Sequence, residues 1–176
     1  YNRDIYFYLY IKMFYEYFIR QAAGMGSASR APDPDKYEHA HAFCDVLIVG
    51  SGPAGIETAL EAAQNKLDVI LVEQDFQLGG NLLNQEGFVH KELFEKLHQA
   101  GVKVMLRTTA FGLYDNNVSG LLERVNDDYE KSFKETPRQR FWTVRSKQIV
   151  LATGAIERHI AFGNNDVPGI MTVNAA

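Results

Sequence analysis

Three glycines and one acidic residue have a spacing that indicates a specific chemistry. Gly50, Gly52 and Gly55 form a G-x-G-x-x-G pattern, and Glu73 lies 23 residues after Gly50. Gly50 permits a tight turn, Gly52 lets the backbone approach a pyrophosphate, and Gly55 lets a helix pack closely on a strand. The pattern therefore predicts a site for the ADP half of FAD or NAD.

The elements that must position these residues are a strand, a helix and a second strand. Val46–Val49 is a continuous apolar run, as expected of a parallel strand covered on both faces. A helix begins near Pro53, and its N-terminal N–H groups face the diphosphate. A second strand over Val69–Val72 ends at Glu73. Its carboxylate can accept hydrogen bonds from ribose hydroxyls and would repel a 2′-phosphate, which disfavours NADP. The predicted buried face of the helix is Ile56, Ala59, Leu60 and Ala63.

Two further runs of small residues extend the predicted site. Leu78-Gly79-Gly80 follows Glu73, and Ala152–Ala155 follows an apolar strand. With the Gly50 loop, they match flavoprotein-type dinucleotide folds better than simple dehydrogenases. The predicted cofactor-binding residues are Gly50, Ser51, Gly52, Pro53, Ala54, Gly55, Glu73, Gln74, Gly79, Gly80, Thr153 and Gly154.

The rest of the chain alternates strands and helices. An amphipathic helix is predicted over His90–Ala100, with Leu93, Phe94 and Leu97 inward and Gly101 closing it. Asn126–Arg140 is predicted to be a charged loop. The predicted strands are Val102–Leu106, Thr109–Tyr114, Val118–Val125, Phe141–Arg145 and Gln148–Leu151. This order predicts an α/β, Rossmann-like FAD/NAD(P)-binding fold of the glutathione-reductase type, with an inserted antiparallel β-meander and an incomplete C-terminus.

Two regions are expected. Residues 1–41 are interpreted as an aromatic-rich helix over Met13–Ala23 and a linker over Gly24–His41, from the end of a preceding domain. Residues 42–176 are interpreted as a partial FAD/NAD(P)-binding domain. His39 and His41 have no third ligand at a useful spacing, so they are interpreted as solvated linker residues. No metal site and no catalytic residue is predicted.

Composition excludes several classes of function. A net charge of -4 gives no sign of a nucleic-acid-binding face. Cys44 is the single cysteine of the sequence, which excludes an internal disulfide framework and the paired redox cysteines of a disulfide reductase. The aromatic stretch Ile5–Ile11 is too short to cross a membrane, which takes roughly 20 apolar residues. Neither a nucleic acid nor a membrane is expected as a partner.

Longer blocks of the sequence resemble the alpha subunit of heterotetrameric sarcosine oxidase. The Gly-rich loop is shared by many flavoproteins, whereas Thr108–Gly112 and Gly154–Arg158 are far more selective. His159 stands where this family usually has a proline, and the segment between Gly80 and Leu93 is shortened. The matching blocks are Phe14–Glu16, Ile19–Gly24, Pro32–His39, Cys44–Gly50, Val72–Asp75, Thr108–Gly112, Tyr114–Asp115, Val150–Arg158, Asn164–Asp166 and Pro168–Gly169.

The resemblance implies a fragment of a much longer cytoplasmic subunit. That subunit would have an N-terminal ferredoxin-like segment, this domain and a C-terminal folate-binding domain, and would assemble with beta, gamma and delta subunits. The family enzyme oxidises sarcosine to glycine, passes the one-carbon unit to tetrahydrofolate and reduces O₂ to H₂O₂. FAD lies in the beta subunit, FMN lies between alpha and beta, and this domain holds NAD. The fragment alone is expected to be inactive.

Other functions remain open at this level. Related subunits act on other amines or imino acids, in opine oxidase, proline or hydroxyproline dehydrogenase and cyanide-forming glycine dehydrogenase. A different class is a non-catalytic subunit in which NAD only rigidifies the assembly. The residues themselves do not distinguish FAD from NAD, because both present the same ADP group.

Overall fold

The computed structural model describes residues 12, 14–16, 18–20, 22–24, 31–33, 35–85, 87, 89–126 and 136–173. The chain divides into two compact units, residues 1–34 and 35–176. In the first unit, the described residues between 12 and 22 are helical, as predicted. Phe14 and Phe18 pack edge to face with ring centroids 5.0 Å apart, and Arg20 pairs with Glu16 at 3.2 Å.

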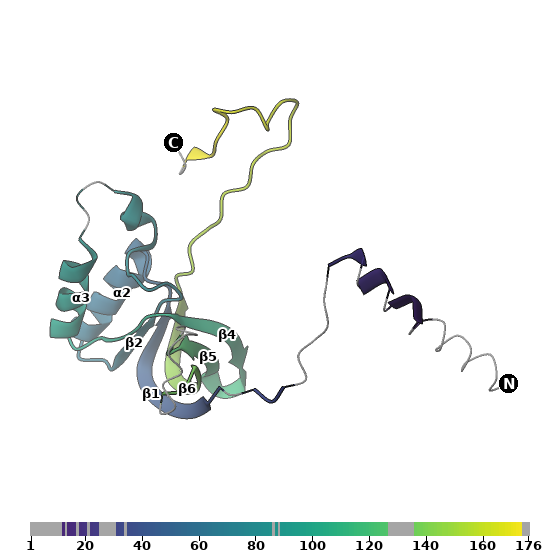
Figure 1. Cartoon of the computed structure of the whole chain (residues 1–176). Coiled ribbons are helices and arrows are strands. Elements are labelled where there is room, and N and C mark those ends of the chain that lie inside the picture. The colour runs from purple at the N-terminus through teal and green to yellow at the C-terminus, as the bar shows by residue number, and fades with distance from the viewer. Residues whose placement is uncertain are drawn as a thin grey trace. The chain divides into compact units, whose positions relative to one another are not determined.

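The strands described in the second unit form one mixed sheet in the order β3-β2-β1-β6-β5-β4 (Figure 1). β3, β2, β1 and β6 are parallel neighbours, whereas β6, β5 and β4 run antiparallel. The strands are β1 (Tyr37–Val49), β2 (Val69–Val72), β3 (Lys103–Met105), β4 (Thr108–Tyr114), β5 (Val118–Arg124) and β6 (Gln139–Leu151). The α-helices are α2 (Pro53–Gln64) and α3 (His90–Gln99), and short 3₁₀ helices span Gly80–Asn84 and Asp115–Asn117. The predicted α/β fold and its meander are confirmed.

Two long strands, β1 and β6, join the parallel part of the sheet to the meander. Val46–Val49 of β1 pairs with β2 on one side and with Gln148–Leu151 of β6 on the other. The earlier part of β1, from Tyr37, pairs with the earlier part of β6, which also pairs with β5. The parallel and antiparallel regions therefore share a continuous backbone.

This sharing corrects three predictions. The linker predicted up to His41 ends earlier, because Tyr37–His41 lies in β1 and pairs with residues 139–143. The separate strands predicted over Phe141–Arg145 and Gln148–Leu151 are one strand, β6. The loop predicted up to Arg140 ends at 138, and its residues 127–135 lie outside the described residues. In each case the pairing partner lies about a hundred residues away, where local pattern gives no signal.

Buried side chains cover both faces of the parallel strands. Val46 and Ile48 pack with residues of α2 and α3, including Leu60 and Leu97, in one apolar cluster. The alternate residue Leu47 packs in a second cluster with residues of the meander strands; Leu121 and Val144 are members. Because successive side chains of a strand point to opposite faces, β1 needs apolar residues at every position here. This explains the continuous apolar run.

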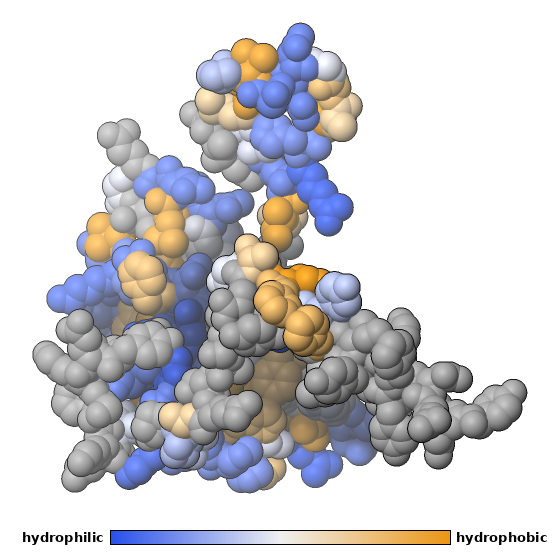
Figure 2. Space-filling view, turned by 45° about the vertical axis from the view of Figure 1, so that its right-hand side comes forward, coloured by the Kyte–Doolittle hydropathy of each residue, from blue (hydrophilic) through white to orange (hydrophobic). Residues whose placement is uncertain are grey.

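After β6 the chain continues without further strands to residue 173, and its apolar side chains are exposed. Ile156, Ile160 and Val173 are 93%, 79% and 85% exposed. Figure 2 shows orange, apolar residues on this segment at the top of the molecule. Exposed apolar groups of this density are typical of surfaces that contact another part of a protein. Among the described residues, no helix is long and apolar enough to cross a bilayer.

The packing of α2 on β1 predicts that Gly55→Ala destabilises this unit. A Cβ on Gly55 would lie 1.9 Å from the carbonyl oxygen of Gly50, so α2 must move. We expect a loss of about 1–3 kcal/mol, the range for overpacking. Hydrogen exchange of the α2 amides in the full-length subunit measures it. Gly163→Ala is the control, because a Cβ there meets nothing within 4 Å; equal exchange in the two variants would contradict the close packing.

Candidate functional site

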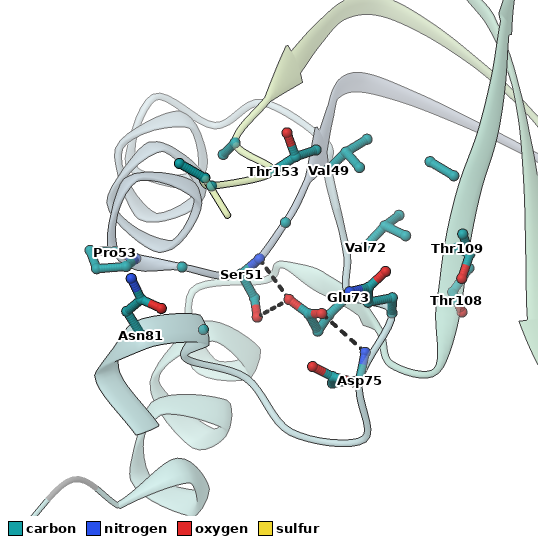
Figure 3. A pocket seen from close by; sticks show the side chains of 18 residues that line it. Val49, Ser51, Pro53, Val72, Glu73, Asp75, Asn81, Thr108, Thr109 and Thr153 are labelled. Carbon is teal, nitrogen blue, oxygen red and sulfur yellow. Dashed lines mark hydrogen bonds between the residues drawn. The ribbon is translucent and has the colours of Figure 1, made fainter. Parts of the chain in front are cut away.

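A pocket of about 310 Å³ opens where β1, β2 and β6 end and β4 begins (Figure 3). It lies at the switch point of the sheet, where the chain leaves β1 toward one neighbour and β6 arrives on the other side, the usual place for ligands in such sheets. Its lining residues are Val49, Gly50, Ser51, Gly52, Pro53, Val72, Glu73, Gln74, Asp75, Gly80, Asn81, Thr108, Thr109, Ala110, Ala152, Thr153, Gly154 and Ala155. Of the predicted site residues, Ala54, Gly55 and Gly79 are not part of this lining.

Gly50 and Gly55 serve the packing of the backbone around the pocket. Gly50 has φ +103°, and a Cβ there would lie 2.3 Å from the carbonyl oxygen of Ala152. Gly55 packs against the Gly50 carbonyl at the distance given above. Both glycines are therefore required by the protein itself, with or without a ligand. They bring the ends of β1 and β6 and the start of α2 into backbone contact.

Gly52 differs from both. Its φ and ψ are −68° and 179°, an extended conformation that any residue adopts, and a Cβ there meets nothing within 4 Å. Neither strain nor packing requires glycine at this position. Because the missing side chain leaves open space in the wall of the pocket, a bound group can reach the backbone of Gly52.

The first turn of α2 begins beside this open space. Pro53 occupies the first turn and has no N–H, and the first bond within the helix runs from Ile56 N to Gly52 O at 3.0 Å. The N–H groups of Ala54 and Gly55 precede that bond and have no partner within the helix. Such N–H groups, with the positive end of the helix dipole, attract an anionic ligand. This position of the predicted residue Ala54 involves its main chain and not its side chain.

Glu73 follows β2 directly and is only 9% exposed. Its Oε2 accepts hydrogen bonds from the backbone N–H of Ser51 at 2.9 Å and from the Ser51 hydroxyl at 2.6 Å. Its Oε1 accepts a bond from the N–H of Asp75 at 3.0 Å. Figure 3 shows these three bonds. A buried carboxylate needs such donors, and here they fix its position at the pocket wall.

The Gly79–Gly80 turn closes the pocket on the side of α2. The Gly79 N–H donates to the Ser51 carbonyl oxygen at 3.0 Å, and a Cβ on Gly80 would lie 3.2 Å from the Gly52 Cα. The close backbone approach predicted for these glycines is therefore an approach to the Gly-rich loop. Both have positive φ, 127° and 51°, which favours glycine.

Sequence reasoning missed one wall of the pocket. Thr108, Thr109 and Ala110, at the start of β4, line it, together with Asp75 and Asn81. The Thr108 N–H bonds to the Glu73 carbonyl oxygen at 2.8 Å, which brings β4 against the end of β2. The Thr108–Gly112 block had been noted for its resemblance, but a strand predicted to begin an inserted meander gave no reason to place it at the site.

The other candidate residues lie away from the pocket. Cys44 is buried in β1, where burial, followed by the nearby Asp68 and Asp45 carboxylates, raises the pKa of its thiol to about 11. A thiol with this pKa is a poor nucleophile at neutral pH. His39 lies in β1 with its ring 5.3 Å from that of Phe141, and not in a linker. Within the described part of the chain, no three His, Cys, Asp or Glu residues gather as a metal site requires.

Known proteins share both the sequence and the fold. The sarcosine oxidase subunit alpha of Rhizobium meliloti is 41% identical over 170 residues, which cover 92% of this chain and 17% of that protein. The subunit alpha of Corynebacterium sp. (strain P-1) is 36% identical and covers 86% and 17%. The chain thus spans about 17% of the length of these curated relatives. The predicted resemblance is confirmed.

A solved structure and a family model agree with this result. The crystal structure of L-proline dehydrogenase from P. horikoshii is 36% identical and superposes with a TM-score of 0.54 over 75% of this chain and 27% of that chain. Residues 44–175 match the model of the pyridine nucleotide-disulphide oxidoreductases, which bind FAD and NAD(P). With the β1–α2–β2 unit and the Gly-rich loop in place, this chain belongs to the pyridine nucleotide-disulphide oxidoreductase family.

Proposed function

We propose that this chain is the nucleotide-binding portion of the alpha subunit of a sarcosine oxidase, and that its pocket holds NAD. The observation that carries the proposal is Gly52, a glycine required neither by conformation nor by packing, beside the open end of α2. A diphosphate would occupy that space, facing the N–H groups of Ala54 and Gly55. The high identity to sarcosine oxidase alpha subunits favours NAD over FAD here, because the family is known to hold NAD in this domain.

Each predicted residue then has a task that suits its place. Glu73 would accept a hydrogen bond from the adenosine ribose through Oε1, while Gln74, Thr109 and Ala110 would form the wall beside the adenosine. Thr153 and Gly154, which follow β6, would lie along the diphosphate. The bound dinucleotide supplies a nicotinamide ring capable of hydride exchange. The residues of this pocket bind and orient it.

The whole protein would act as part of a larger complex. We propose partner subunits beta, gamma and delta in the cytoplasm, with FAD, FMN and tetrahydrofolate bound elsewhere in the assembly. The complex would oxidise sarcosine to glycine, reduce O₂ to H₂O₂ and transfer the one-carbon unit to tetrahydrofolate. The relatives opine oxidase and proline dehydrogenase are less favoured, because identity is higher and coverage wider for sarcosine oxidase.

A second proposal is that the nucleotide is structural and takes no part in turnover. It is favoured by the pocket itself: among its lining residues, all of which the structure describes, Glu73 and Asp75 are the only ionisable side chains. Glu73 is occupied by hydrogen bonds from Ser51 and Asp75. The absorbance of the nucleotide in the purified complex tests this proposal. A spectrum that stays constant during sarcosine oxidation supports a structural role, and reduction of the nucleotide on addition of sarcosine rules it out.

Gly52→Val is predicted to abolish nucleotide binding while the fold is kept. The valine side chain would fill the space proposed for the diphosphate, and no protein atom lies near enough to strain it. The nucleotide is released from the purified full-length complex by denaturation and identified by mass spectrometry. Gly163→Val, at an exposed position equally free of neighbours, is the matched control. A Gly52→Val complex that retains one NAD per alpha subunit would refute the placement of the diphosphate.

Glu73→Ala is predicted to weaken NAD binding by roughly 1–3 kcal/mol, the range for losing a hydrogen bond to a charged group. The variant loses the acceptor for the ribose and the anchor of Ser51. Calorimetry on nucleotide-free full-length complex measures the change, with the exposed Glu57→Ala in α2 as a control of equal charge change. Unchanged affinity in Glu73→Ala would show that the ribose is held by other groups.

A further inference from the structure

Ser51 connects the segments that surround the pocket. It is fully buried, and it separates the two glycines of the loop that have different tasks, Gly50 and Gly52. Its hydroxyl donates to Glu73 Oε2 at 2.6 Å, and its N–H donates to the same oxygen at 2.9 Å. The Gly79 N–H lies 3.0 Å from its carbonyl oxygen and 3.2 Å from its Oγ. One residue thus joins the Gly-rich loop, the acid after β2 and the Gly79–Gly80 turn.

The bonds to Glu73 are unequal between its two oxygens. A carboxylate oxygen accepts about two hydrogen bonds, so the two donors of Ser51 occupy Oε2. Oε1 accepts the N–H of Asp75 and retains room for one further donor. The acceptor left for a ligand therefore lies on one oxygen, and the bonds from Ser51 decide which one it is.

We infer that Ser51 is a positioning residue that holds the Glu73 carboxylate by Oε2, so that Oε1 receives one ribose hydroxyl of the dinucleotide. The inference rests on the proposed function and goes beyond it, because it assigns the orientation of the acid to a side chain within the Gly-rich loop. G-x-G-x-x-G chemistry asks nothing of this intervening side chain, since its diphosphate contacts come from the backbone. Here the hydroxyl links the two halves of the adenosine diphosphate site, the diphosphate loop and the ribose acid.

The alternative is that Ser51 serves only the fold. Its buried hydroxyl would then need an acceptor merely to avoid an unpaired polar group. The two roles differ in their dependence on Glu73. A positioning residue affects nucleotide affinity through Glu73 and has no effect once that carboxylate is removed, whereas a residue that shapes the loop affects affinity in either background.

A double-mutant cycle separates the two roles. NAD⁺ affinity is measured by calorimetry for nucleotide-free full-length complex carrying Ser51→Ala, Glu73→Ala, both or neither. We expect Ser51→Ala to weaken binding roughly tenfold, in keeping with a hydrogen bond to a charged group. We expect no further loss when it is added to Glu73→Ala. Thr58→Ala is the matched control, because Thr58 also lies beside the loop, yet its hydroxyl bonds to the Ala54 carbonyl and not to Glu73.

Each outcome decides the inference. An unchanged affinity in Ser51→Ala, or an equal loss in the Glu73→Ala background, overturns it. Ser51→Cys, which keeps the shape but is a much weaker donor, should fall between wild type and Ser51→Ala. If both Ser51 variants fail to assemble while Thr58→Ala assembles, Ser51 belongs to the fold and the inference is wrong. Failure of the proposed function has a different signature: the unmodified nucleotide-free complex would then bind neither NAD⁺ nor ADP-ribose.

Discussion

The approach of bare backbone to bare backbone at the ends of β1 and β6 is the constraint on which the rest of this structure depends. The Gly50 carbonyl lies where a side chain on Gly55 would stand, and the Ala152 carbonyl lies where one on Gly50 would stand. These contacts hold α2 directly behind the first strand, so that its first turn faces the crevice at the switch point of the sheet. The space beside Gly52 exists because its neighbours are packed this closely. Packing and binding are therefore produced by the same loop through different glycines.

The two long strands give this crevice its fourth wall. Because β1 and β6 continue beyond the parallel region, the meander is an extension of the same sheet, and it returns β4 to the end of β2. The bond from Thr108 N to Glu73 O fixes that return. The meander also covers the face of the parallel strands that α2 and α3 leave open, through Leu121 and Val144. It thus completes the core and the pocket together, which a four-residue β2 could not do alone.

The sequence predicts the parts of this molecule that depend on local pattern. The apolar run before Gly50, the helix from Pro53 and the acid after Val72 all stand where spacing places them, because each is set within one β-α-β unit. Long-range pairing is different. Tyr37–His41 resembles a linker because its strand partners lie at residues 139–143, and Thr108–Ala110 resembles a meander edge because its contact with the end of β2 is not local. The bond from Ser51 to Glu73 was likewise invisible, since a serine between glycines carries no pattern of its own.

The most direct test of this account is an experimental structure of the full-length complex purified with its native nucleotide. The account predicts density for an adenine dinucleotide in this crevice, with the diphosphate against the backbone of Gly52 and the start of α2 and with its ribose beside Glu73. A crevice closed by side chains of the remaining chain, or an adenine dinucleotide bound only elsewhere in the complex, would contradict it.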